Sequence, residues 1–471
     1  MYRKNIILLL TVLTVGMLSG YSLNEFHYGY KLNTFDATAV SMGNTGTAGS
    51  SNPFGITLNA VNTLNQTGTF GFETSLNAAK VEDKRSFPMY NSFNAYINES
   101  TYTAEESINY NLGAAITYKM DINDTNHLGF GLYTAPKHSF VGDYNEEVRN
   151  NRGSNDDEFP ERIAVNRIKN KGNLMAYGIA LAYKATLDMP YLKSLAIGAN
   201  IEMLDGNAKS TKSVRFTDWA HNAAGYGVLP DYEVVYDRDL SGFTTQIGMN
   251  YEINHRTTLA FVYNPKTTIE VDATSRLNRF KTYVDSTHTY DFVMTGADSL
   301  KHAVMLNDYD LPSSYKFAVQ FKPRNILKTT FNVEAELVRW SETNKLFADK
   351  FNYYLGIEHK IIETIPVRMG FSSTHSYEIA YDNEYAYAVE LMTPTVALGT
   401  GFKFSNRLKA DLGFTYSFRT YETLDLFMDE YYKYPALWPN SHINLTNRDW
   451  GNPDTVKENI FDFMFSLTLD L

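Results

Sequence analysis

Apolar and polar residues alternate along most of this chain, in about fourteen segments of roughly 9 to 14 residues each. A period of two residues places neighbouring side chains on opposite faces of a β-strand. The clearest case is 458–471, where one face holds Phe461, Phe463, Phe465, Leu467, Leu469 and Leu471 and the other holds Asp462, Met464, Ser466, Thr468 and Asp470. Segments of this length cross a bilayer when they are tilted, so the pattern predicts membrane-spanning strands.

The connections between the expected strands are alternately short and long. The strands are expected at 67–79, 107–119, 126–135, 172–184, 193–205, 241–253, 256–265, 311–322, 328–340, 351–361, 365–373, 392–404, 406–418 and 458–471. In transmembrane barrels the short turns face the periplasm and the long loops face outside. The sequence therefore predicts an all-β, fourteen-stranded antiparallel transmembrane barrel over residues 67–471.

The first residues have the features of an exported protein. Arg3 and Lys4 precede an apolar run from Ile6 to Leu18, and small residues follow, so residues 1–22 are expected to be a signal peptide. No later stretch approaches the roughly 20 apolar residues of a spanning helix. The chain has no cysteine, which excludes a lipid anchor on cysteine and a disulfide framework. The expected location is the outer membrane of a diderm bacterium.

Composition fits this location. Aromatic residues make up 14% of the chain, and barrels use such residues as girdles at the two membrane interfaces. Trp340, at the end of an expected strand, is assigned to such a girdle. The formal charge is −11, and it becomes about −13 without Arg3 and Lys4, which argues against nucleic acid as a partner.

Residues 23–66 differ from everything after them. They include a stretch of small residues from Asp36 to Ser50, followed by Asn52, Pro53 and Phe54. A fourteen-stranded cylinder is too wide to be filled by its own side chains, so this segment is expected inside the barrel as a hatch. The alternative is a flexible periplasmic tail.

The polar faces of the strands supply candidate luminal groups. Phe331 and Val333 alternate with Asn332, Glu334 and Glu336, and the latter three are expected to face the lumen. Arg368 and Lys316 also lie on polar faces. Either cation could pair with a ligand carboxylate, or with Glu334 or Glu336 inside the barrel.

Motifs for other chemistry are missing. The sequence has no Gly-x-Ser-x-Gly or His-Glu-x-x-His, so no enzyme, no catalytic residue and no cofactor is expected. Acidic clusters in the expected loops, as at 155–158, could bind divalent cations, but a solvated loop is the preferred interpretation and no metal site is assigned.

Several segments resemble the FadL family of outer-membrane transporters for long-chain fatty acids and other hydrophobic compounds. They are Ser41-Met42-Gly43, Leu311–Tyr315 with Lys322-Pro323, Glu334–Ser341, Tyr354–Glu358, Pro366–Phe371, Thr393–Gly399 and the final strands. The resemblance implies a monomeric barrel plugged by an N-terminal hatch, with an apolar ligand leaving sideways through the wall into outer-membrane lipid. The family's hatch commonly holds Asn-Pro-Ala, which here corresponds either to Asn52-Pro53-Phe54 or to Asn59 with Ala60.

The leading hypothesis is passive transport of hydrophobic small molecules, such as long-chain fatty acids, with Asn52, Pro53, Phe54, Asn59, Arg368 and Lys316 as candidate gate or ligand residues. PorV-like proteins look like the same barrel and are docking subunits of a protein secretion system, which is the alternative. An aqueous porin is a third possible function, and the expected hatch argues against it. A tight apolar pocket beneath the loops would favour transport, whereas a large exposed apolar patch on the loops would favour secretion.

Overall fold

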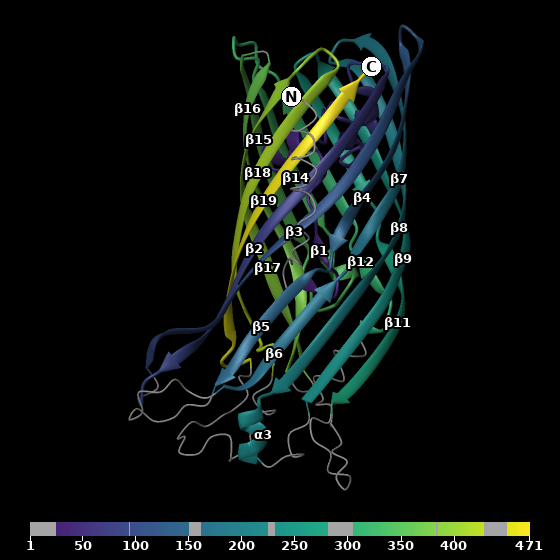
Figure 1. The fold of residues 1–471 in the computed structure, drawn as a ribbon. Coiled ribbons are helices and arrows are strands. Elements are labelled where there is room, and N and C mark those ends of the chain that lie inside the picture. The colour runs from purple at the N-terminus through teal and green to yellow at the C-terminus, as the bar shows by residue number, and fades with distance from the viewer. Residues whose placement is uncertain are drawn as a thin grey trace, which may run out of the picture.

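A computed structural model describes residues 25–93, 95–149, 162–224, 231–280, 305–362, 364–382, 385–427 and 450–471. Within these residues fourteen strands close an antiparallel barrel, as the alternation predicts (Figure 1). The expected signal peptide (1–22), the acidic stretch at 155–158 and the aromatic residues at 431–438 lie outside the described residues.

The wall follows the sequence order, each strand pairing with the next. Its strands are β2 (Phe70–Tyr90), β3 (Tyr96–Asn123), β4 (Asn126–Ser139), β7 (Asn173–Met189), β8 (Leu192–Phe216), β9 (Asp231–Asn254), β10 (Thr257–Asn264), β13 (Ser314–Phe321), β14 (Thr330–Val338), β15 (Lys350–Ile362), β16 (Ile365–Asp382), β17 (Tyr385–Lys403), β18 (Leu408–Thr423) and β19 (Asp454–Asp470). The barrel closes where β19 pairs with β2, from Thr455 opposite Ser86 to Asp470 opposite Gly71.

Alternation places the side chains as expected. On β14, Asn332, Glu334 and Glu336 are buried in the lumen, whereas Phe331 and Val333 are exposed on the outer surface. On β19, Asp462 and Met464 face inward and Phe463 faces outward. The lumen of this barrel is therefore rich in charged groups that must find partners inside it.

Two regions expected to be loops contain strands. The stretch expected as a loop at 136–171 holds the hairpin β5 (Gly142–Arg149) and β6 (Arg162–Lys171), and the connection before β13 holds β11 (Thr267–Phe280) and β12 (Tyr309–Leu311). β6 and β11 extend the ladders of β8 and β9. These extensions have little alternation of apolar and polar residues, so the sequence pattern does not predict them as strands.

The hairpin of β2 and β3 reaches farthest from the barrel, at lower left in Figure 1. Beyond the pairing of Ser86 with Thr455 its two strands pair only with each other, and a bulge lies beside this position. Bulges bend strands, which accounts for the change of direction. At the tip Tyr90, Phe93 and Tyr96 are exposed.

In the residues that the structure describes, the helical elements are few and short. They are α2 (Ala37–Ser41), η2 (Pro53–Thr57), η3 (Ala60–Leu64), α3 (Asp218–Ala224) and η4 (Trp340–Glu342). None of the helices in the described part of the chain is long and apolar enough to cross a membrane.

Candidate functional site

Residues 25–66, which we call the luminal segment, lie inside the barrel (Figure 1). The helix α2 packs against β16, β17, β18 and β19, and η3 packs against β4, β7, β8 and β9. Together these two elements contact opposite parts of the wall. A short strand in the same segment, β1 (Tyr30–Lys31), pairs with Ser139 and His138 of β4.

The small residues of the segment allow its backbone to touch the wall. Gly43 has φ +69°, a conformation that side chains disfavour. A Cβ placed on Gly43 would lie 2.7 Å from the amide nitrogen of Phe371 and 2.8 Å from the carbonyl oxygen of Leu355. The motif Ser41-Met42-Gly43 therefore serves as a backbone contact between the luminal segment and β15 and β16.

A buried carboxylate holds the next turn of the segment. Glu334 of β14 accepts hydrogen bonds from the backbone amides of Gly46 (2.7 Å) and Thr47 (2.9 Å) and from the hydroxyl of Thr47 (2.6 Å). Charge-assisted bonds of this kind are stronger than neutral ones. Glu334 thus anchors the luminal segment to the wall.

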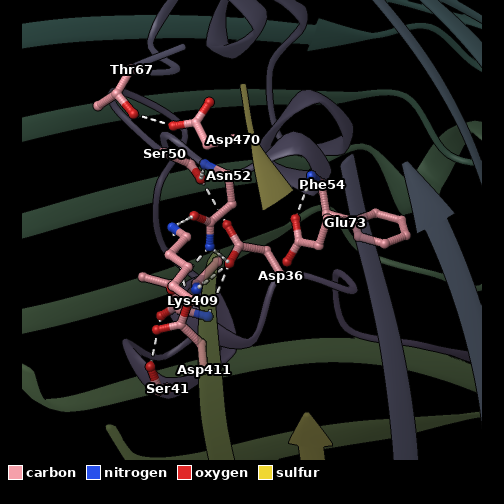
Figure 2. A network of polar contacts seen from close by, with 12 residues as sticks. Asp36, Ser41, Ser50, Asn52, Phe54, Thr67, Glu73, Lys409, Asp411 and Asp470 are labelled. Carbon is pink, nitrogen blue, oxygen red and sulfur yellow. Dashed lines mark hydrogen bonds and ion pairs between the residues drawn. The ribbon is translucent and has the colours of Figure 1, made fainter. Parts of the chain in front are cut away.

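Asp36 is the centre of a polar network inside the segment (Figure 2). It caps α2 by accepting from the amides of Thr38 and Ala39, and it also accepts from the hydroxyl of Ser50 (2.7 Å) and the side-chain amide of Asn52 (2.7 Å). Lys409 of β18 donates to the side-chain oxygen of Asn52. The predicted gate residue Asn52 therefore links the segment to the wall.

The remaining predicted gate residues are also buried. Pro53 begins η2, and the amide of Phe54 donates to Glu73 of β2 at 2.9 Å (Figure 2). Asn59 caps η3 through Val61, and its amide group donates to Asn250 of β9 at 2.8 Å. Both candidate motifs, Asn52-Pro53-Phe54 and Asn59-Ala60, thus contact the wall, at different strands.

The two predicted cations already have partners. Arg368 donates to Glu358 and to Asp411, both at 2.7 Å. Lys316 lies 3.8 Å from Glu334 and 4.1 Å from the centre of the Tyr354 ring. The luminal ion pair foreseen for Lys316 therefore forms with Glu334, whereas Arg368 pairs with carboxylates other than Glu334 and Glu336.

Aromatic rings gather on the loop side of the luminal segment. We call this group the aromatic cluster; its members are Tyr28, Tyr309, Trp340, Phe347 and Tyr377. Tyr28 lies at the centre, with its ring 5.6 Å from Tyr309, 6.1 Å from Trp340 and 6.3 Å from Phe347. The girdle assignment of Trp340 is wrong: the indole is buried in the aromatic cluster, because η4 turns it inward after β14 ends.

Arg238 of β9 is a functional candidate that the sequence did not single out. Its side chain is fully buried, it donates to the carbonyl oxygens of Phe26 (2.8 Å) and His27 (3.3 Å), and it lies over the rings of Phe26 and Phe140. Burial and the charge of Arg238 lower the pKa of His27 to about 3, so His27 is neutral. No local pattern marks Arg238, since its partners are more than two hundred positions away.

The wall has a break beside the first described residues of the luminal segment. Backbone pairing of β3 with β4 ends at Ala114 and Thr134, and in the described residues no backbone pair joins β3 to β4 or β5 beyond that point. Side-chain contacts replace the ladder there, such as Asn109 to the Ser139 hydroxyl at 3.4 Å. Phe140 at this break contacts Phe26 at 6.0 Å, so the break adjoins the luminal segment.

A polar cavity of about 440 Å³ lies on the side of the luminal segment that faces the short turns. It is lined by Asp36, Asn52 and Lys409, and by residues of the short turns such as His255 and Arg256. The polar lining suits water rather than an apolar molecule. In the described part of the chain no group of three or more His, Asp or Glu side chains could hold a metal ion.

Comparisons with solved structures find barrels of the same fold. A Pseudomonas aeruginosa FadL homologue matches with a TM-score of 0.56 at 11% identity, over 94% of this chain and 99% of that one. The P. putida toluene transporter TodX matches with a TM-score of 0.50 at 12% identity, over 93% and 99%. The Ralstonia pickettii toluene transporter TbuX matches with a TM-score of 0.50 at 11% identity, over 93% and 99%.

No protein-family model and no curated protein matches the sequence. The resemblance to FadL-type barrels drawn from the sequence is thus confirmed at the level of the fold. At this level of identity the likeness carries the architecture and leaves the function to be argued from the site.

Proposed function

We propose that the protein is an outer-membrane transport protein for the passive uptake of hydrophobic small molecules, in particular long-chain fatty acids. The observation that carries the proposal is the break between β3 and β4, which adjoins the luminal segment at Phe26. An apolar molecule entering from the loops meets aromatic rings, and the nearest exit is sideways through the wall.

Lateral exit suits such a molecule energetically. Each methylene that moves from water into an apolar environment gains about 0.8 kcal/mol. Leu112, which has 64% of its surface exposed on the outer face of β3, lies beside the break, so the exit opens at a lipid-facing surface. Passage into the bilayer therefore needs no energy source.

The luminal segment is the hatch in this proposal. It is held to the wall by Glu334 and by Lys409, which binds its Asn52, and it lies between the aromatic cluster and the polar cavity at the short-turn end. A sealed short-turn end keeps the barrel from leaking while the lateral path remains available. The names of the similar structures, a FadL homologue and toluene transporters, also support an apolar cargo.

The test is to close the break chemically. The chain has no cysteine, so Asn109→Cys with Ser139→Cys can be joined by a short bifunctional thiol reagent. The matched control is Thr395→Cys with Ser417→Cys, whose native side chains lie 2.8 Å apart across the paired strands β17 and β18.

Uptake of labelled oleate by proteoliposomes is expected to fall at least fivefold after crosslinking at Asn109 and Ser139, and to be unchanged by the control crosslink. Unchanged uptake with a fully crosslinked break would overturn the lateral path. Loss of uptake in both would show that rigidity of the wall, rather than the break, matters.

A second candidate function has its own observation. The tip of the β2–β3 hairpin exposes Met89, Tyr90, Phe93, Tyr96 and Ile97, and exposed aromatic groups of this kind mark protein-binding surfaces. This favours the secretion-type docking function. Replacing residues 89–97 by a short Asn-Gly turn should leave oleate uptake unchanged if transport is the function, and should abolish export of a cargo protein if docking is.

A further inference from the structure

The polar cavity on the short-turn side of the luminal segment carries an excess of positive charge. Its lining holds seven Lys and Arg side chains but only four Asp and Glu side chains, which gives a net charge of +3. The chain as a whole has a net charge of −11. A concave site whose charge is opposite in sign to that of the whole protein attracts anions, and about 440 Å³ is the size of a small-molecule site.

The four carboxylates of the lining are already engaged. Asp36 accepts hydrogen bonds inside the luminal segment (Figure 2). Glu252, Glu358 and Asp411 each lie within 4.0 Å of at least one of four cations, which are Lys184, Lys360, Arg368 and Lys409. Three carboxylates thus serve four cations, and none is left to neutralise the rest.

The other three cations of the lining are Arg256, Lys322 and Lys403. In the part of the chain that the structure describes, no carboxylate forms an ion pair with any of them. Arg256 lies in the turn between β9 and β10, Lys322 follows β13, and Lys403 is the last residue of β17. The amide of Lys322 donates to the carbonyl oxygen of Arg256 at 2.8 Å, so these two residues are neighbours at the end of the wall.

The cations of this group repel one another. Lys322 is close enough to Lys360 for the two positive charges to interact unfavourably. Glu252 and Glu358 also act on Lys322, but neither lies within ion-pair distance of it. An anion that binds among these cations replaces repulsion by attraction, and it gains most if it carries more than one negative charge.

We propose that this cavity binds a small soluble anion with two or more carboxylate or phosphate groups, and that Arg256, Lys322 and Lys403 are its ligands. The short turns of such barrels face the periplasm, so the anion enters from that side. This inference goes beyond the proposed transport function and does not depend on it, because the ligand is hydrophilic and its site lies across the luminal segment from the aromatic cluster.

The probes are citrate, which has three carboxylates, and acetate, which has one. Binding of each is measured by isothermal titration calorimetry on the full protein in an uncharged detergent at equal ionic strength, for the native chain, Lys322→Gln and Lys403→Gln. The matched control is Lys209→Gln, which also removes one positive charge but lies near the loop end of β8, where Lys209 pairs with Asp237 at 2.9 Å.

We expect the native chain to bind citrate at least about tenfold more tightly than acetate, and Lys322→Gln and Lys403→Gln each to weaken citrate binding about tenfold. Lys209→Gln should leave citrate binding unchanged, and added salt should weaken it in the native chain. Because Lys322 and Lys403 have no ion-pair partner in the described structure, neither replacement should lower the melting temperature.

Three outcomes would overturn the proposal. The native chain would bind no citrate, or all three variants would weaken citrate binding equally, which would mean that net charge rather than a site attracts the anion. Binding of hexaglutamate but not of citrate would replace the small anion by an acidic segment of a partner protein. Oleate uptake by Lys322→Gln should stay at the native level, so the transport function is tested separately.

Discussion

Glu334 on the wall and Thr47 in the luminal segment are joined by two hydrogen bonds, one to the amide (2.9 Å) and one to the hydroxyl (2.6 Å) of Thr47. Both oxygens of the carboxylate are used, one for each bond. This contact ties the segment to a strand that lies nearly three hundred positions away.

Glu334→Gln should loosen this contact. The amide that replaces the carboxylate removes the charge from three bonds, and hydrogen bonds to charged groups contribute about 1.5–3 kcal/mol each, so a loss of about 2 kcal/mol in local stability is expected. Hydrogen exchange at the amides of Gly46 and Thr47 should accelerate accordingly. Glu106→Gln, at a residue whose side chain is 65% exposed, is the control and should leave these amides protected.

Gly43→Ala should displace the luminal segment from β16. Its Cβ would lie within 2.8 Å of backbone atoms that cannot move aside, and its φ of +69° is strained for alanine. Gly46→Ala is the matched comparison: Gly46 also has positive φ, but the nearest atom to its Cβ is 3.4 Å away. Ion leak across planar bilayers should rise strongly for Gly43→Ala and only slightly for Gly46→Ala; equal leak would refute the contact argument.

Acid should weaken docking of the first described residues. The pKa of His27 falls from 6.5 to about 3 because of burial and the neighbouring Arg238. The released segment binds the proton more readily than the docked one, so docking is strongest above pH 6.5 and weakens as the pH falls from 6.5 toward 3, by at most about 1.4 kcal/mol per unit.

Protease cleavage near residue 25 at pH 5 and pH 7 measures this dependence. Cleavage should be faster at pH 5 in the native chain, and the difference should disappear in His27→Gln, which cannot take up a proton. A pH effect of the same size in His27→Gln would show that another group titrates.

Arg368→Met should destabilise the barrel rather than alter its ligand preference. The guanidinium neutralises Glu358 and Asp411, and breaking a buried ion pair by removing one partner costs about 3–5 kcal/mol. Urea unfolding should shift to lower denaturant, while the affinity for oleate, measured on the folded fraction, should remain within a factor of two. A selective loss of oleate affinity would restore Arg368 as a ligand residue.

Periodicity alone predicted most of the wall, because lipid on one side and the lumen on the other impose alternation on every spanning strand. The inward direction of Glu334 and Arg368 follows from it. Their partners cannot be predicted in this way. Arg368 pairs with Glu358 because these residues face each other in the ladder of β15 and β16, and neither strand alone determines that register.

Residues outside the regular alternation were harder to place. Trp340 lies just beyond a strand, and its direction depends on a single turn of η4. The role of Arg238 depends on its hydrogen bonds to the carbonyl oxygens of residues 26 and 27, which are distant in the sequence and come next to it only in the folded barrel. The strands β5, β6 and β11 lie beyond the closed part of the barrel, where nothing forces one face to be apolar.

The closure of β19 onto β2 has a consequence for how the molecule forms. Gly71 and Asp470, which pair in the ladder, are 399 positions apart in the sequence. Contacts between such distant residues are slow to form, since a very long loop must be closed before they contribute. Until then β2 and β19 present unpaired edges that can join other chains. Newly made chains must therefore be kept apart from one another until both edges have met.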